Sequence, residues 1–66
     1  MDEFNFADWL ATELKKKGWD PIDLDIASGI SRSSIELYMR NKQYPTLYSF
    51  ERILEAFDKH IEIVDN

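Results

Sequence analysis

Hydrophobic residues recur along most of the chain with the spacing of one face of a helix. In the first segment, the Asn5 side chain can accept hydrogen bonds from the free N–H groups of a following helix, and Gly18 provides a stop after three consecutive lysines. Between these two residues we predict a helix over residues 6–17. Its hydrophobic stripe is formed by Phe6, Leu10 and Leu14, with Trp9 beside it.

Two short helices joined by a tight turn are predicted in the middle of the chain. The first begins after Asp20, a capping residue followed by a proline, and ends near Ser28, where a glycine provides the turn. The second begins after Ser31, whose hydroxyl can cap it, and continues to Arg40 or Asn41. The two helices can bury a shared seam through Leu24, Ile30, Ile35 and Tyr38.

A fourth helix is predicted over residues 47–58, with Thr46 as its cap. We assign its hydrophobic stripe to the core: Leu47, Phe50, Ile53, Leu54 and Phe57. From residue 59 to residue 66 hydrophobic and polar residues alternate instead, which predicts a short strand or extended tail. Such a tail can provide the edge of a dimer or fold back on the first helix.

The composition indicates one small domain over residues 1–66. Aromatic residues make up 14% of the chain, which supplies enough core material to disfavour disorder. The sequence contains no cysteine, so disulfides and cysteine-based zinc sites are excluded. It shows no long apolar run and no basic start of a signal peptide. We therefore expect an all-α, cytoplasmic protein without a membrane segment.

The net charge of −5 disfavours a general nucleic-acid binder, which would be basic overall. The charges are unevenly distributed, however. Between residues 29 and 45, Arg32, Arg40 and Lys42 outnumber the single acidic residue Glu36, whereas most acidic residues lie toward the two ends of the chain. A basic face on an acidic body is compatible with DNA binding of low non-specific affinity.

The two central helices, within residues 20–42, have the layout of a helix-turn-helix, whose second helix enters the DNA major groove. On its outward face, Arg32 can donate to guanine or a phosphate, Glu36 can accept from a cytosine amino group, and Leu37 can touch a thymine methyl. The alternative is an ordinary solvated face with a Glu36–Arg40 ion pair. An exposed Leu37 favours the functional interpretation, because a solvated face has no need of it.

Motifs of catalysis are absent from the sequence. There is no glycine-rich phosphate loop, no nucleophile elbow and no helix with paired histidines. His60 has no other histidine or acidic residue at the spacing of a metal ligand. We therefore expect neither an enzyme nor a metal, cofactor or small-molecule substrate.

These residues resemble the Cro/repressor-type helix-turn-helix proteins of phages, mobile elements and bacteria, the XRE family. The resemblance covers residues 6–64. It is carried by Gly18, Leu24, the run from Ala27 to Ile35, Lys42, Pro45-Thr46-Leu47 and the run from Leu54 to Phe57. It implies a lambda-repressor-like bundle of four to five short helices with a short extended tail, and sequence-specific binding to double-stranded DNA, usually as a homodimer.

The resemblance also assigns site residues. Those facing bases would be Arg32, Ser33, Glu36 and Leu37. Those holding phosphates would be Ser31, Arg40, Asn41, Lys42 and Tyr44.

The chain departs from the family at the first of the two central helices. A glutamine usually grips a phosphate where this chain has Asp20-Pro21, so that clamp is expected to be lost. Asp25 stands where a small residue is usual, and it requires either a donor or a rotated helix. Ala27 or Ser28 would then supply the close approach.

A third departure is compensated. The family often pairs an arginine late in its first helix with a glutamate late in its third, and here both positions are apolar, Leu14 and Met39. This double change supports contact between the two helices. Two functions stay open: a DNA-binding regulator of repressor, lysogeny or autoregulatory type, and a protein-interaction module of the same fold, such as an antitoxin-like partner.

Overall fold

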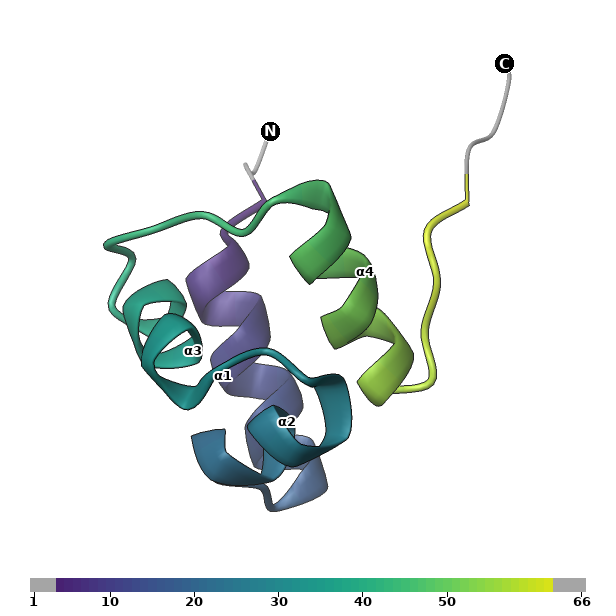
Figure 1. Ribbon diagram of the computed structural model, residues 1–66, viewed down its shortest axis with the longest axis horizontal. Helices are drawn as coiled ribbons and strands as arrows, with labels where there is room; N and C mark the ends of the chain where they lie inside the picture. Colours follow the sequence, from purple (N-terminus) through teal and green to yellow (C-terminus); the bar gives the residue numbers. More distant parts are fainter. Residues whose placement is uncertain (1–3, 63–66) are drawn as a thin grey trace.

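Helices account for all the regular secondary structure in the part of the chain that the computed structural model describes, residues 4–62. They are α1 (Phe6–Lys17), α2 (Pro21–Ser28), α3 (Arg32–Met39) and α4 (Leu47–Ala56). In Figure 1, α1 runs through the middle, α3 and α4 lie on either side of it, and α2 crosses in front. No helix within these residues is long and apolar enough to cross a membrane.

Local signals define α1 as predicted. The Asp8 backbone N–H donates to Asn5 Oδ1 at 3.0 Å, which satisfies one of the free donors at the start of the helix. At the other end Gly18 adopts a φ of +68°, and its N–H donates to the Leu14 and Lys15 carbonyls. That left-handed conformation is open to glycine at little cost, so the helix ends there.

The starts of α2 and α3 are also capped. Asp23 accepts a hydrogen bond from the Asp20 backbone N–H at 2.8 Å, and Ser31 Oγ accepts from the Ser34 backbone N–H at 3.2 Å. Between the two helices Gly29 adopts a φ of +79°. The predicted turn between the central helices is therefore confirmed.

The core lies where the helices meet, and α3 contacts both α1 and α2. Its centre is formed by residues with no solvent exposure: Leu10, Leu24, Ile35 and Ile53. Burying each such side chain contributes about 1.5–3 kcal/mol. Phe6 joins α1 to α4 and α3, because its ring centroid lies 5.4 Å from Phe50 and 5.7 Å from Tyr38. The predicted contact between the first and third helices is confirmed, with Leu14 buried and Met39 packed against the core.

Two helix ends differ from the prediction. Helix α3 ends at Met39 and α4 ends at Ala56, because the residues just beyond them turn. Asn41 and Asp58 have φ values of 59° and 60°, and the N–H of the residue after each donates back to a carbonyl of the last turn. A left-handed residue followed by such a bond is a common way to end a helix.

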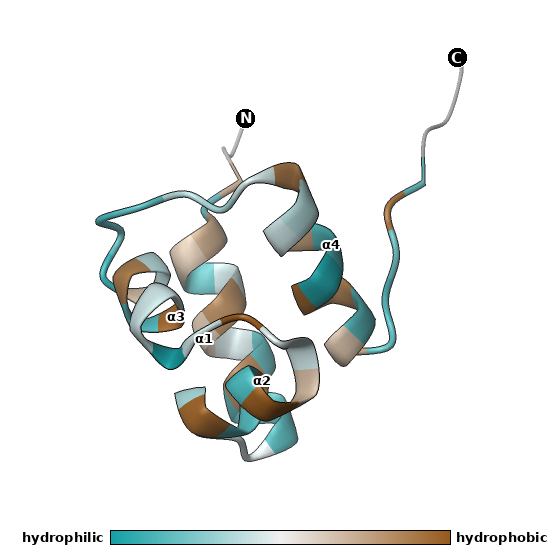
Figure 2. Cartoon of the chain, in the orientation of Figure 1, coloured by the Kyte–Doolittle hydropathy of each residue, from teal (hydrophilic) through white to brown (hydrophobic). Residues whose placement is uncertain are grey.

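The prediction that Leu47 belongs to the core is wrong. Its side chain is 66% exposed, whereas Ile53, Leu54 and Phe57 are buried. Leu47 is the first residue of α4, where the helix extends past its neighbours. The hydrophobic stripe of α4 therefore continues beyond the part of the helix that the other helices cover. Figure 2 shows this hydrophobic start of α4 at the edge of the molecule.

After α4 the chain turns back beside that helix (Figure 1). Residues 59–62 have no strand conformation, and Ile63 and Val64 of the predicted strand lie outside the described residues. A groove of about 150 Å³ separates this segment from α4 and is lined by Glu51, Leu54, Glu55, Lys59, His60 and Ile61. Lys59 Nζ lies 3.6 Å from Glu13 Oε1, which connects the segment to α1.

Candidate nucleic-acid interface

The angle between α2 and α3 is set at Ser28. This side chain is 1% exposed; its Oγ donates to the Leu24 carbonyl at 2.6 Å and accepts from the Ile30 N–H at 3.1 Å. Of the two residues predicted to supply a close approach, Ser28 is buried and Ala27 is exposed. The hydroxyl both ends α2 and fixes the direction in which the chain leaves it.

The Asp25 carboxylate is paired with a hydrogen-bond donor, as its half-buried position requires. Asp25 Oδ2 accepts a hydrogen bond from the Arg32 backbone N–H at 2.9 Å. Arg32 is the first residue of α3, so its N–H would otherwise have no partner within the helix. A carboxylate at this point also interacts favourably with the positive end of the helix dipole. The departure at Asp25 thus stabilises the junction between α2 and α3.

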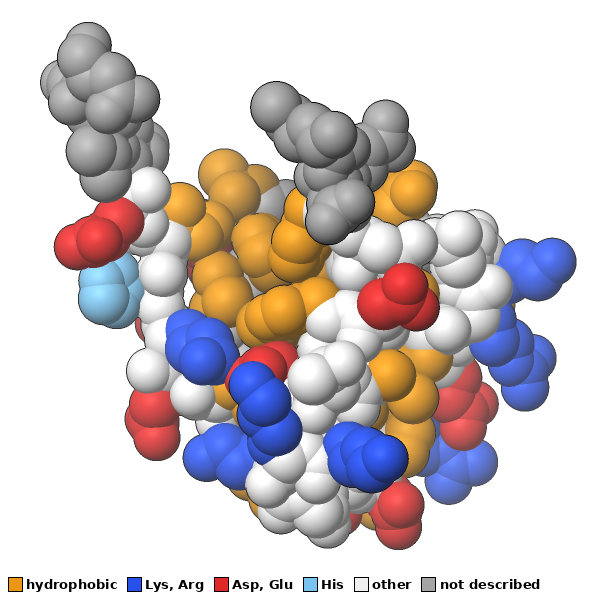
Figure 3. Space-filling model, turned by 180° about the vertical axis from the view of Figure 1, so that it is seen from behind, with side chains coloured by type: hydrophobic (Ala, Val, Ile, Leu, Met, Phe, Trp, Pro, Cys, Tyr) orange, Lys and Arg blue, Asp and Glu red, His pale blue; other side chains and the backbone are white. Residues whose placement is uncertain are grey.

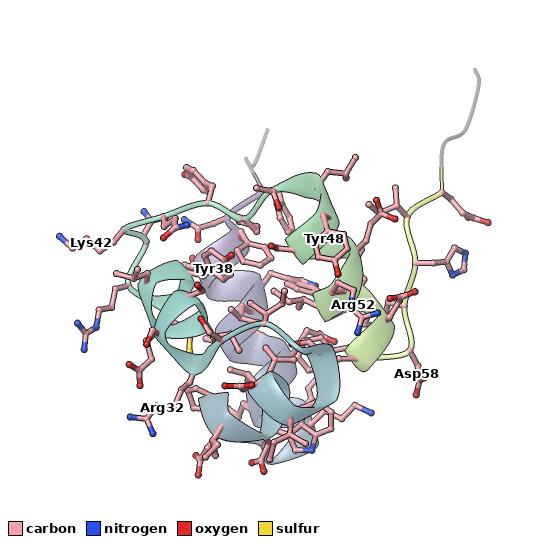
Figure 4. The ribbon with its side chains drawn as sticks, viewed as in Figure 1. Arg32, Tyr38, Lys42, Tyr48, Arg52 and Asp58 are labelled. Atoms are coloured by element: carbon pink, nitrogen blue, oxygen red, sulfur yellow. The ribbon has the colours of Figure 1, made fainter. Side chains whose placement is uncertain are left out.

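Arg52 of α4 holds the same junction from the other side. Arg52, labelled in Figure 4, donates from Nε to the Ser28 carbonyl at 3.1 Å, and its Nη1 lies 3.5 Å from Glu55 Oε1. This bond joins residues 24 positions apart and ties α4 to the turn between α2 and α3. No local pattern in the sequence connects Arg52 to Ser28, so this contact was not predicted.

Helix α3 buries one side and leaves the other open. Ile35 and Tyr38 are buried in the core. Arg32, Ser33 and Leu37 are exposed, and Glu36 is half-buried. The four predicted base-facing residues therefore share one surface, with Arg32 at the edge of the molecule in Figure 4.

The ion pair on this surface differs from the Glu36–Arg40 pair that the alternative interpretation expects. Glu36 does not pair with Arg40. Glu36 Oε2 instead lies 3.4 Å from Arg32 Nε, one turn earlier on the helix. Both side chains are about half exposed, at 59% for Arg32 and 42% for Glu36. The pair is therefore accessible to a partner that approaches α3 from outside.

The loop after α3 carries most of the predicted phosphate contacts. Arg40, Lys42 and Tyr44 are exposed, and Lys42 points away from the molecule in Figure 4. The backbone of this loop is held by a bond from the Lys42 N–H to the Leu37 carbonyl at 2.9 Å. Positive charge is thus placed beside the outward face of α3.

Two of the predicted phosphate residues have structural roles as well. The Ser31 hydroxyl accepts from the Ser34 N–H and lies 3.0 Å from the Ser34 hydroxyl, so it is engaged as the cap of α3. Asn41 is exposed and adopts the left-handed conformation that ends this helix. Asn41 thus lies between Arg40 and Lys42, whereas Ser31 lies at the other end of α3.

At the start of α2 the Asp20 backbone N–H is already hydrogen-bonded within the chain and is not available to a ligand. It is bound by the Asp23 carboxylate at 2.8 Å, and the next residue is a proline. This end of α2 therefore presents negative charge where the family resemblance would place a phosphate contact. The loss of a phosphate clamp here stays a prediction.

Comparisons with protein-family models, curated proteins and solved structures found no match to this chain. The function of the surface therefore rests on its own geometry. Its exposed groups are cations, one hydroxyl, one carboxylate and one aliphatic side chain. They lie on a short helix whose start is held by the Asp25 carboxylate and whose end is held by the hydrogen bond from the Lys42 N–H to the Leu37 carbonyl. This set can donate to and accept from a polar partner but holds no nucleophile paired with a base.

Proposed function

We propose that this chain binds double-stranded DNA in a sequence-specific manner and acts as a small transcriptional regulator. In this proposal α2 and α3 form the helix-turn-helix of a lambda-repressor-like bundle, and α3 enters the major groove. The regulator is a repressor of phage, mobile-element or autoregulatory type that acts in the cytoplasm.

The main support is the outward face of α3. Leu37 is 39% exposed between polar neighbours, while Ile35 and Tyr38 on the opposite side fill the core. An aliphatic side chain at the centre of an exposed helical face gains nothing from water, but it can contact a thymine methyl in the major groove. Arg32, Ser33 and Glu36 beside it supply the donors and acceptors that base edges require.

Phosphate contacts come from the cations that flank this face. Arg40 and Lys42 are exposed beside α3, and Tyr44 has 72% of its surface accessible with its hydroxyl available to donate. Contacts of this kind position a protein on the duplex and do not discriminate sequence. Ser31 and Asn41 complete the proposed phosphate set.

The proposed regulator is a homodimer. Several hydrophobic side chains remain exposed away from α3, and Figure 3 shows hydrophobic side chains gathered on the rear of the molecule. Leu47 and Ile61 are among the exposed ones, at 66% and 43%. Covering such residues with a second copy would remove apolar surface from water and match a two-fold operator.

DNA binding is tested by fluorescence anisotropy with duplex fragments taken from the promoter regions of the protein's own locus. We expect affinity to fall steeply as salt rises, and Arg40→Ala to weaken binding to every fragment while lowering the salt slope by about one unit. Lys15→Ala, an exposed cation on α1, is the matched control and should leave both quantities unchanged. Absence of binding to all fragments at low salt would refute the proposal.

A second candidate, a protein-interaction module such as an antitoxin-like partner, is supported by α2. Ile22 and Ile26 are exposed at 50% and 79% on consecutive turns of this helix, and carboxylates stand at the starts of both α2 and α3. This candidate predicts a stable complex with the product of a neighbouring gene. It also predicts that Arg40→Ala leaves that complex intact, whereas Ile26→Asp disrupts it.

A further inference from the structure

The Arg32–Glu36 pair lies on the exposed surface of α3 and begins at the first residue of the helix. Arg32 uses Nε to contact Glu36 Oε2 at 3.4 Å. Within residues 4–62 neither of the two side chains makes a hydrogen bond or ion pair with a third residue. The pair therefore keeps donors and an acceptor side by side and facing outward.

A phosphate fits this pair poorly. The Glu36 carboxylate lies next to the guanidinium, so an approaching phosphate would meet a negative charge together with the positive one. A second carboxylate, Asp25, already binds the Arg32 backbone N–H at 2.9 Å and adds to that repulsion. The surrounding charges thus argue against a purely electrostatic role for Arg32.

A G·C base pair fits it well. In the major groove guanine presents acceptors at O6 and N7, while the cytosine amino group beside O6 is a donor. The terminal nitrogens of Arg32 match the two acceptors, and the free oxygen of Glu36 matches the donor. No other base pair offers two acceptors on one base and a neighbouring amino donor on the other.

We propose that Arg32 and Glu36 act as one unit that reads a single G·C base pair, with Arg32 on guanine and Glu36 on the cytosine amino group. This inference rests on the proposed function, because it requires α3 to lie in the major groove. The Arg32–Glu36 contact neutralises the carboxylate, which reduces the cost of bringing Glu36 close to DNA. It also holds the long arginine side chain in a defined orientation before binding.

The test begins with selection of bound duplexes from a random-sequence library by the full chain. Each half of the selected two-fold site should contain one position where G·C is preferred by at least about fivefold over every other pair. Arg32→Ala and Glu36→Ala should each abolish the preference at that same position. The double variant should lose no more preference than either single variant.

Two control variants complete the experiment. Lys42→Ala should weaken binding to all sequences and leave the base preferences unchanged, because Lys42 is assigned to a phosphate. Glu51→Ala removes an exposed carboxylate on α4 and should change neither quantity. Circular dichroism spectra of all variants verify that the helices are retained.

The outcomes separate this inference from the proposed function. If no duplex is enriched, both fail. If a site is enriched but Arg32→Ala and Glu36→Ala alter different positions, or lower affinity uniformly, DNA binding stands and the paired readout is overturned. Loss of the G·C preference at one shared position supports both.

Discussion

The Asp25 carboxylate accepts a hydrogen bond from the Arg32 backbone N–H at 2.9 Å, which links α2 to the first residue of α3. The bond satisfies a helix donor that has no intrahelical partner. It also places a negative charge at the end of the helix that we assign to DNA recognition. Asp25 therefore favours the fold while opposing an approaching phosphate.

Removal of this carboxylate should destabilise the protein. Asp25→Ala leaves the Arg32 N–H without its acceptor, and we expect the free energy of unfolding to fall by about 1 kcal/mol, the usual effect of losing a helix cap. Asp25→Asn retains an acceptor oxygen and should cost less. Urea unfolding followed by far-UV circular dichroism measures both changes. Equal stability of the Ala variant and the parent chain would contradict the assigned role.

Arg52 should stabilise the junction through its bond to the Ser28 carbonyl at 3.1 Å. Arg52→Met keeps much of the aliphatic stem but removes the donor, so we expect a loss of about 1 kcal/mol in urea unfolding. Glu55→Gln is the matched control, because it removes only the exposed ion pair and should cost less than about 0.5 kcal/mol. If the two variants lose the same stability, the bond to the turn contributes nothing.

Substitution of Asp58 can raise the free energy of unfolding instead of lowering it. The Asp58 φ of 60° is a left-handed conformation that costs a non-glycine residue energy. Asp58→Gly should therefore raise the free energy of unfolding by about 0.5 kcal/mol, after allowance for the greater freedom of glycine in the unfolded chain. Asp58→Val should lower it, since a β-branched residue tolerates this conformation least. Thermal unfolding of the two variants should thus give midpoints on either side of the parent value.

Local signals explain why so much of the fold could be predicted. Asn5, Gly18, Ser31 and Gly29 act on residues within a turn of themselves, so the bounds of α1 and the end of α2 follow from short stretches of sequence. Leu47 shows where such signals fail. Its place on the stripe of α4 is correct, but whether a neighbouring helix covers it depends on tertiary packing.

The candidate site was predicted less completely, because its geometry depends on contacts between distant residues. The outward face of α3 followed from helical periodicity. The ion-pair partner of Glu36 could not be predicted in this way, because Arg32 and Arg40 both stand four residues from it. Only the positions of the side chains show that Glu36 pairs with Arg32. The contacts of Asp25 and Arg52 join residues 7 and 24 positions apart, and nothing in the intervening sequence indicates them.

Glu13 is a buried carboxylate that stands seven residues after Phe6 and three after Leu10, so helical periodicity places it beside the hydrophobic stripe of α1. It is 7% exposed and lies 3.2 Å from Lys16 and 3.6 Å from Lys59. Lys59→Met leaves it with a single cation, and we expect a loss of about 0.5–1 kcal/mol at low salt that becomes smaller at high salt. Lys15→Met, at an exposed site on the same helix as Glu13, should have no such salt-dependent effect. Urea unfolding at two salt concentrations distinguishes the two variants.

The charge of Asp25 also predicts an effect on DNA binding. Asp25→Asn keeps an acceptor for the Arg32 N–H but removes one negative charge from the start of α3. At a separation of about 6 Å in water, one charge pair contributes about 0.7 kcal/mol, so affinity for a duplex should rise about threefold at low salt and less at high salt. Glu51→Gln, which neutralises an exposed carboxylate on α4, is the control and should have no effect. Unchanged affinity of Asp25→Asn would mean that the start of α3 does not face the phosphates, and it would favour the protein-interaction alternative.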